Sequence, residues 1–357
     1  MTDRERLATL VRQHGWAATC TQALNPGLEI WTDDGSAVAY RRVPTRPGGR
    51  FVRVTAGEPV SPASALERAQ RAFEADAARH GEGVIWFGVE RLDRLAGDRA
   101  RLVIGAQPVW APSGWDAMVA ASASVRAQRN RALNKQVEVQ EWPSGRVTQS
   151  PEVHAILAAW LSTRGLPPLG FLTDPLVLDH LGDRRVWVAT RASQPIAYAV
   201  LAPIPAREGW LVEWLVRRRE APNGTAAMLL DTAVRTVADE GARYVTLGLV
   251  PLARHAPPTH GLSSTVRATL RWARAHGRRF YDFEGLERFK AKFRPDRWDP
   301  VWLLTTEPQV TLFTLYAVAG AFSRDLGTIH LVGRALGGAV ASEARAVREV
   351  LSWSPRS

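Results

Sequence analysis

The chain has 357 residues, a length that fits two domains or one doubled domain with a sizeable core. Its formal net charge of +11 favours a polyanionic partner such as nucleic acid, anionic lipid or a phosphorylated metabolite, although an arginine-rich composition alone also explains it. The single cysteine, Cys20, excludes an internal disulfide framework and a cysteine-rich zinc site, and it indicates a reducing compartment.

Neither end of the sequence predicts a membrane segment. The first 16 residues carry charges where a signal peptide would be apolar. The longest apolar run, residues 310–322, has 13 residues and is too short to cross a bilayer. We therefore expect a cytoplasmic protein, and peripheral contact with the inner face of the membrane stays open.

The first part of the chain alternates strand and helix patterns. Turn residues and alternating apolar positions predict a hairpin over 27–43, and helical periodicity predicts a long helix over 115–136. Between and after them we expect a strand within 50–62, a helix over 64–81, and strands over 83–89 and 137–142.

The second part repeats this plan. Residues 184–204 predict two strands around Ser193-Gln194, and a further strand at 209–218 precedes a helix at 224–241. We also expect helices at 151–165 and 264–277 and strands at 243–252 and 278–283. The doubled pattern predicts an α/β fold of two similar domains, mixed sheets flanked by helices, at 1–145 and 146–305. A helical tail at 306–357 is expected to pack on the second domain.

Three basic segments could carry function, and the first is the predicted long helix. No acidic residue separates Asp116 from Glu138, whereas solvent-facing helices usually mix both signs of charge. A stretch of one sign suits phosphate contacts. An ordinary solvated basic face is the alternative. The basic residues are Arg126, Arg129, Arg131 and Lys135.

The second basic segment joins a strand to a helix. Arg217, Arg218 and Arg219 end the strand, and Pro222-Asn223-Gly224 turns the chain into a helix that begins near Thr225. Free backbone N–H groups at a helix N-terminus beside guanidinium groups make a good anion site. A simple capped turn is the alternative.

The third basic segment, residues 281–300, interleaves basic and aromatic side chains after Gly285, where we expect a sharp turn. A lysine between aromatic walls can offer charge to a developing oxyanion, and aromatic faces can stack an unpaired base. A solvated helix face is the alternative. The central residues are Phe289, Lys290, Lys292 and Phe293. The close pair His255 and His260 lies in a proline-rich loop, and we expect no metal there.

These motifs resemble a known family. "PNGTAAMLLDTAV", "GARYVTLGLVPLA" and "FYDFEGLERFKAKFRPDRWDPVWL" are similar to the C-terminal catalytic domain of bacterial phosphatidylglycerol lysyltransferases, in particular to stand-alone soluble members. "VRAQRNRALNKQVEVQEW" and "WLSTRGLPPLGFL" extend the resemblance to most of the chain. It implies tandem acetyltransferase-type (GNAT-like) domains and transfer of an aminoacyl group from aminoacyl-tRNA to a hydroxyl.

More distantly, the Gly-Leu-x-x-Phe-Lys-x-x-Phe core is similar to that of Fem-type aminoacyltransferases, in which a lysine beside a phenylalanine lies at the aminoacyl ester. The resemblance thus assigns Lys290 and Phe289 to the catalytic site. The sequence departs from the membrane enzymes at two places. Glu213 stands where they have an aspartate, and Val216 stands where an arginine follows it, with Arg217 next to it. Phosphatidylglycerol is therefore one candidate acceptor among lipids and small molecules.

We expect Lys290 to neutralise charge on the tetrahedral intermediate or on the leaving ribose oxygen. Glu213 would orient the acceptor or the donor amino group, or act as general base; a structural ion pair with Arg217 is the alternative. The remaining residues would bind tRNA phosphates: Arg217, Arg218, Arg219, Asn223, Gly224, Thr225, Lys292, Arg126, Arg131 and Lys135.

The donor ester is already activated, so the reaction needs no cofactor or metal. The expected partners are aminoacyl-tRNA and an anionic phospholipid at the membrane surface, and no protein partner is inferred. Two other functions stay open. One is an acyl-CoA-dependent N-acyltransferase of the same fold, although "RREAPNGTA" departs from the usual pyrophosphate loop. The other is a protein that binds tRNA or membrane surfaces without catalysis.

Overall fold

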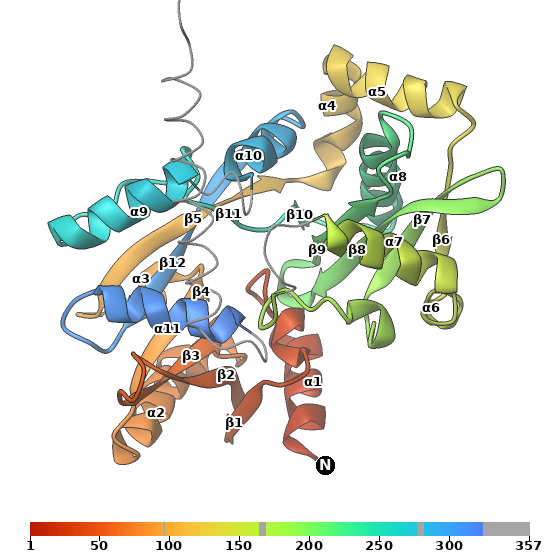
Figure 1. Cartoon of the computed structure of the whole chain (residues 1–357). Coiled ribbons are helices and arrows are strands. Elements are labelled where there is room, and N and C mark those ends of the chain that lie inside the picture. The colour runs from red at the N-terminus through yellow and green to blue at the C-terminus, as the bar shows by residue number, and fades with distance from the viewer. Residues whose placement is uncertain (96, 164–168, 277–281, 324–357) are drawn as a thin grey trace, which may run out of the picture.

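The computed structural model describes residues 1–95, 97–163, 169–276 and 282–323. Its strands form one mixed sheet in the order β1-β2-β3-β4-β12-β5-β10-β9-β8-β7-β6, with β11 paired to β5 (Figure 1). The strands are β1 (Glu29–Asp33), β2 (Ser36–Pro44), β3 (Phe51–Ala56), β4 (Gly83–Val89), β5 (Ala100–Trp110), β6 (Glu138–Trp142), β7 (Arg185–Arg191), β8 (Gln194–Ile204), β9 (Gly209–Arg217), β10 (Tyr244–Thr246), β11 (Val250–Pro251) and β12 (Arg297–Thr305).

Helices lie on both faces of this sheet. Those predicted over 64–81, 151–165, 224–241 and 264–277 are present, the helices Asp3–His14, Leu92–Leu95 and Ser144–Thr148 had no predicted counterpart, and one prediction is corrected. The helix predicted over 115–136 is two helices, because Ser122 has an extended backbone and its Oγ caps the second one at Val125 N, 3.4 Å away. The helices are α1 (Asp3–His14), α2 (Leu66–Arg79), α3 (Leu92–Leu95), α4 (Trp115–Ala121), α5 (Ala123–Asn134), α6 (Ser144–Thr148), α7 (Pro151–Ser162), α8 (Thr225–Asp239), α9 (Ser264–His276), α10 (Phe283–Ala291) and α11 (Leu312–Phe322).

The two parts of the chain share one plan. In the first part β1, β2 and β3 form an antiparallel meander, and α2 leads into β4, which runs parallel to β3. In the second part β7, β8 and β9 form the meander, and α8 leads into β10, parallel to β9. The doubled α/β plan, with mixed pairing and flanking helices, is therefore confirmed.

The halves are joined by strands that cross between them. β12 comes after every element of the second half, yet it lies between β4 and β5 of the first half. β5 in turn pairs with β10 and so makes the sheet continuous. Residues 297–305, assigned from sequence to the second domain, thus complete the sheet of the first; the boundary near residue 145 stays a prediction.

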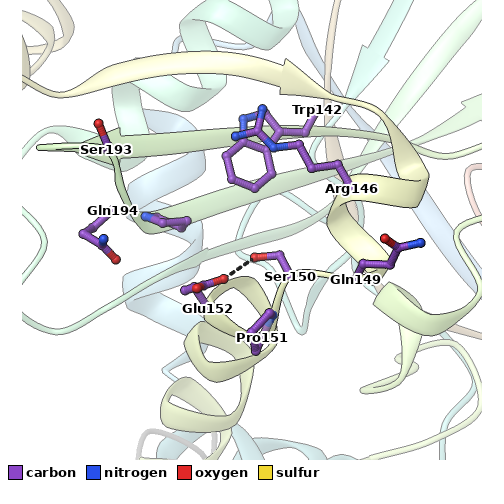
Figure 2. A pocket seen from close by; sticks show the side chains of 9 residues that line it. Trp142, Arg146, Gln149, Ser150, Pro151, Glu152, Ser193 and Gln194 are labelled. Carbon is purple, nitrogen blue, oxygen red and sulfur yellow. Dashed lines mark hydrogen bonds between the residues drawn. The ribbon is translucent and has the colours of Figure 1, made fainter.

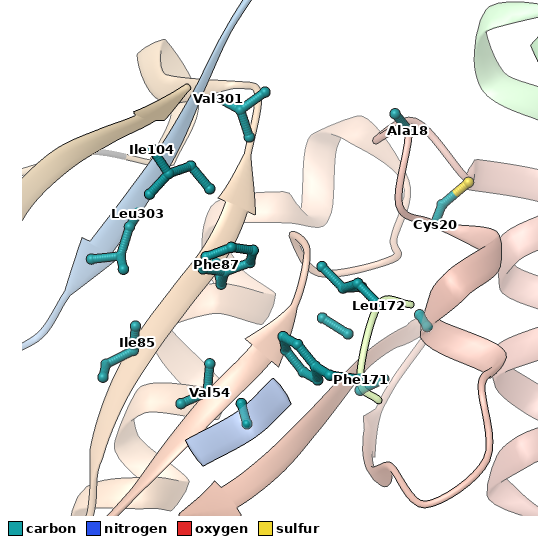
Figure 3. Close-up of a cluster of buried hydrophobic side chains, with 14 of the residues drawn as sticks. Ala18, Cys20, Val54, Ile85, Phe87, Ile104, Phe171, Leu172, Val301 and Leu303 are labelled. Atoms are coloured by element: carbon teal, nitrogen blue, oxygen red, sulfur yellow. The ribbon is translucent and has the colours of Figure 1, made fainter. Parts of the chain in front are cut away.

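One hydrophobic cluster is also shared by both halves. Figure 3 shows Phe87 of β4 among side chains of β3, β5 and β12, facing Phe171 from the segment between α7 and β7. The ring centroid of Phe87 lies 6.2 Å from that of Phe171 and 5.4 Å from that of Phe322 on α11. Each such phenylalanine contributes about 2 to 3 kcal/mol when it is fully buried.

The start of the predicted tail, α11, packs mainly on the first half, whereas we expected the tail to pack on the second domain. α11 packs on β2, β3 and β4 of the first half, with Ala317 and Ala321 buried in that cluster, and its Phe322 also meets Phe171 of the second half at 5.1 Å. Residues 324–357 lie outside the described part of the chain. No helix among the described residues is long and apolar enough to span a membrane.

Candidate functional site

α10 carries the Phe-Lys motif, and its first turn corrects the sequence prediction. Gly285 was expected in a sharp turn, but it lies inside the helix, where its N–H donates to the Asp282 carboxylate that caps α10, at 2.9 Å. A Cβ on Gly285 would collide with that carboxylate, which is why the position is glycine. The strand predicted over 278–283 lies mostly outside the described residues, and its end, Phe283, already belongs to the helix.

Lys290 is buried near the end of α10 and is only 5 % exposed. Its Nζ donates to three backbone carbonyl oxygens, those of Leu247 at 2.5 Å, Gly248 at 2.8 Å and Leu249 at 3.2 Å. Burial lowers the pKa of Lys290 to about 7, while the three carbonyl acceptors favour the protonated form. The ammonium group is therefore held by the segment between β10 and β11, and we call this arrangement the carbonyl cage.

The carbonyl cage sits where two parallel strands diverge. β10 pairs with β9 only as far as Thr246 and Leu211, whereas β9 continues to Arg217. Residues 247–249 bulge out between the β10 and β11 pairings with β5, and Gly248 takes a φ of +69° there. Lys290 thus binds the strand segment that opens away from β9.

The aromatic residues around Lys290 belong to the core of the second half. Phe293 is fully buried and stacks on Trp115 with centroids 5.9 Å apart, and Phe289 meets its edge at 5.4 Å. Lys292 lies 5.9 Å from the centroid of Phe289 and donates to the side chain of Gln128 on α5. Burial lowers the pKa of Lys292 as well. These contacts join α10 to α5.

The Pro-Asn-Gly turn between β9 and α8 lies directly beneath α5. Gly224 has a φ of +101°, and a Cβ there would overlap the backbone carbonyl of Gln128. Arg129 reinforces the contact through an ion pair with Asp231 of α8 at 3.3 Å. Glycine at 224 is therefore required both by its backbone conformation and by the close approach of α5.

The exposed basic residues gather at one end of the second half. β9 ends at Arg217 beside Ala197 of β8, next to the tight turn between β7 and β8, and α5 lies across the start of α8 at the same end. Arg218 is half-buried and donates to Pro195 O at 3.4 Å. We call this surface the basic end. Its exposed members are Arg217, Arg219, Asn223, Arg126, Arg131 and Lys135, and Arg191 at the end of β7 joins them.

Glu213 lies apart from Lys290 and has a partner other than the one expected. It is the extra residue of a β-bulge in β9, and its side chain is 1 % exposed. Arg184 donates to it at 2.5 and 3.2 Å, and Gln22 at 3.3 Å. The alternative of an ion pair with Arg217 is therefore wrong in its partner, because Glu213 pairs with Arg184. Among the described residues, Glu213 and Lys290 share no hydrogen bond or ion pair.

A second cluster of buried charged residues lies at the junction of the two halves, and sequence patterns did not predict it. Glu90, at the end of β4, lies 3.0 Å from Arg207, whose guanidinium stacks over Tyr244 at 4.4 Å. Burial raises the pKa of Glu90. Glu58 holds the backbone N–H of Glu90 at 2.6 Å and pairs with Arg91. The spacing along the chain could not reveal this cluster, because it draws on three separate elements.

His255, one of the two close histidines, donates its Nδ1–H to the carboxylate of Glu287 on α10 at 2.7 Å, and its ring stacks on Trp298. In the described ranges no group of three potential ligands is placed to hold a metal ion.

Solved structures share this fold at low sequence identity. The C-terminal domain of a putative lysylphosphatidylglycerol synthetase from Agrobacterium fabrum matches with a TM-score of 0.73 and 18 % identity, over 90 % of this chain and 97 % of that one. L-PGS from Bacillus licheniformis matches with a TM-score of 0.72 and 16 % identity, over 89 % and 95 %. FemX matches with a TM-score of 0.53 and 12 % identity, over 89 % and 98 %.

No curated protein sequence matches the chain significantly. The family model described as phosphatidylglycerol lysyltransferase, C-terminal, matches residues 29–305, which is well over half of the chain. The match covers β1 to β12 and includes α10 with the carbonyl cage and α5 with the basic end. The chain therefore belongs to the phosphatidylglycerol lysyltransferase C-terminal family, a family of aminoacyltransferases.

Proposed function

We propose that this protein transfers an amino acid from aminoacyl-tRNA to a hydroxyl group of phosphatidylglycerol or of another lipid or small acceptor. The observation that carries the proposal is the basic end, which flanks the place where β9 and β10 diverge. Exposed arginines and a lysine there supply positive charge for the phosphates of a tRNA acceptor stem, and each neutralised phosphate releases counterions. Family membership supports an aminoacyl transfer and leaves donor and acceptor to experiment.

Within this proposal Lys290 acts through space. All three of its ammonium protons are donated to carbonyl oxygens, so its charge stabilises a developing oxyanion electrostatically and not by a direct hydrogen bond. Phe289 and Lys292 hold α10 against α5 and keep that charge in a dry setting. The donor ester is already activated, and the proposed chemistry needs positioning and charge stabilisation without a cofactor.

Glu213 has a positioning role in the same proposal. Its carboxylate accepts two hydrogen bonds from Arg184 and one from Gln22, so both of its oxygens are already engaged within the protein. The ion pair with Arg184 fixes the bulge in β9 and so the shape of the opening beside β10.

Contact with anionic lipid is supported by a surface patch on the first half. Phe51 and Phe313 are 39 % and 53 % exposed, and Leu312 beside the latter is 44 % exposed. Arg42 lies over the ring of Phe51 at 4.0 Å, and Arg46 lies 5.9 Å from the centroid of Phe313. Aromatic and basic side chains together are typical of surfaces that bind the headgroup region of anionic bilayers.

The test is a transfer assay with purified protein, tRNA charged with radiolabelled amino acids, and either phosphatidylglycerol vesicles, phosphatidylcholine vesicles or a metabolite extract. We expect label to move from tRNA into one new product. Lys290→Met should lower the rate at least tenfold while tRNA binding stays unchanged. The exposed Arg71→Ala on α2 serves as the matched control.

Each outcome identifies one reaction. Label in phosphatidylglycerol or in a soluble product names the acceptor class. A parallel reaction contains acetyl-CoA. Label that stays on tRNA while acetyl-CoA is consumed would favour the acyl-CoA-dependent reaction, and binding of tRNA without turnover of either donor would favour a non-catalytic protein.

A further inference from the structure

A polar hollow opens on the face of the second half opposite α5 and α8. Its volume is about 600 Å³, within the roughly 300–1,000 Å³ of small-molecule sites. Figure 2 shows Arg146 with Trp142 on one side, the hydrogen-bonded pair Ser150 and Glu152 below, and Ser193 with Gln194 across from them. The residues come from β6, α6, the start of α7 and the turn between β7 and β8.

The hollow contains a ready stacking surface. The guanidinium of Arg146 lies over the ring of the buried Trp142, 3.5 Å from its centroid, and Arg146 itself is exposed. In the described part of the chain Arg146 has no ion pair. A flat ligand can therefore extend the stack as a third layer, as nucleobases do on arginine planes.

The rim offers polar groups suited to a base edge. Glu152 accepts from Ser150 at 2.8 Å, and hydrogen bonds from its own backbone and from Ser150 lower its pKa, so it is ionised at neutral pH. A carboxylate accepts from an exocyclic amino group of cytosine or adenine, and uracil has no such group. Gln194 faces it with an amide that both donates and accepts.

The turn that carries Ser193 is strained. Ala192 and Ser193 have φ values of +46° and +63°, where a two-residue hairpin turn prefers asparagine and glycine. Such strain in non-glycine residues is often found at functional sites. Arg191, directly before this turn, belongs to the basic end, so a ligand whose base lies in the hollow would direct its phosphates toward Arg191 and Arg217 and away from Glu152.

We infer that this hollow binds an unpaired nucleotide whose base carries an exocyclic amino group, stacked on Arg146 and read by Glu152. The inference rests on the proposed function, in which the nucleotide belongs to the single-stranded end of the donor tRNA. The adenine of a coenzyme A molecule shares this chemistry and is the other source.

The test measures binding of fluorescein-labelled trinucleotides CCA and UUU by anisotropy to the wild type, Arg146→Ala, Glu152→Gln and the remote control Arg71→Ala. We expect wild type and control to bind CCA at least about tenfold more tightly than UUU. Arg146→Ala should weaken CCA binding by about tenfold, and Glu152→Gln should abolish the preference over UUU. Both substitutions are at exposed positions, and unchanged thermal midpoints will show that the fold is retained.

Displacement of CCA by coenzyme A, and not by cytidine monophosphate, would assign the hollow to a coenzyme instead of tRNA. Equal binding of CCA and UUU, or unchanged binding by Arg146→Ala, would overturn the inference. Neither result depends on turnover. If the transfer assay succeeds while these variants bind normally, only the nucleotide site fails; if no transfer occurs but the site binds CCA, only the proposed reaction fails.

Discussion

The ionisation of Lys290 makes the free energy of unfolding depend on pH, and the substitution Lys290→Met removes this dependence. Burial lowers the pKa of Lys290 to about 7 in the folded protein, whereas an unfolded lysine titrates near roughly 10.4. Between these values the unfolded state binds more protons, so the folded state becomes more stable as pH rises. At about 1.4 kcal/mol per pH unit, wild type should become about 3 kcal/mol more stable relative to Lys290→Met between pH 7 and pH 9.5.

The assay is chemical denaturation of wild type, Lys290→Met and the exposed control Lys135→Met at pH 7, 8 and 9.5. The chain contains only three lysines, Lys135, Lys290 and Lys292, so ¹³Cε-lysine NMR gives three resonances and the variant identifies that of Lys290. We expect its resonance to titrate near pH 7 and the stability difference to grow with pH. A constant difference with an unmoved resonance would show that the carbonyl cage keeps Lys290 charged and that burial does not set its pKa.

Three further outcomes follow from the same contacts. Arg184→Met should lower the free energy of unfolding by about 3 to 5 kcal/mol, because it leaves a buried carboxylate unpaired, and urea denaturation at pH 7 measures this. Gly224→Ala should lower the free energy of unfolding by about 2 kcal/mol more than Gly241→Ala does, because both glycines have a positive φ but only Gly224 lies against α5. Equal thermal midpoints of the two variants would refute the close packing. If the basic end binds tRNA, Arg217→Ala and Arg219→Ala should each reduce the slope of log K against log salt by about 0.7 to 0.9, and unchanged slopes would place the tRNA elsewhere.

The sequence predicts the meanders and crossover helices well, because their signals are local. The turn at Ser193 is flanked by two apolar runs whose pattern predicts strands, and both runs are strands in the structure. β5 and β12 carry no such signal. Pro108 and Pro300 lie in them, and proline normally argues against a central strand because it donates no ladder hydrogen bond.

The candidate site residues were proposed from sequence motifs, whereas their contacts had no local signal in the sequence. The basic residues around Lys290 are typical of an exposed segment. Lys290 is buried instead, because its Nζ binds carbonyl oxygens some 40 residues earlier in the chain. One signal in the sequence was overlooked. The chain is rich in arginine and has only three lysines, yet residue 290 is a lysine. A compact ammonium with three donors matches three carbonyl oxygens, whereas a planar guanidinium does not. The link between Glu213 and Arg184 has no local signal, since 29 residues separate them.

The position of β12 determines when this protein can fold during synthesis. β4 and β5 are synthesised early. β12, the strand that hydrogen-bonds to both of them, is complete only at residue 305. Until that residue has left the ribosome, the two earlier strands present unpaired inner edges, which are templates for wrong pairing with other chains. The sheet of the first half is therefore completed only when residues 297–305 are available, later than that of a separate N-terminal domain would be.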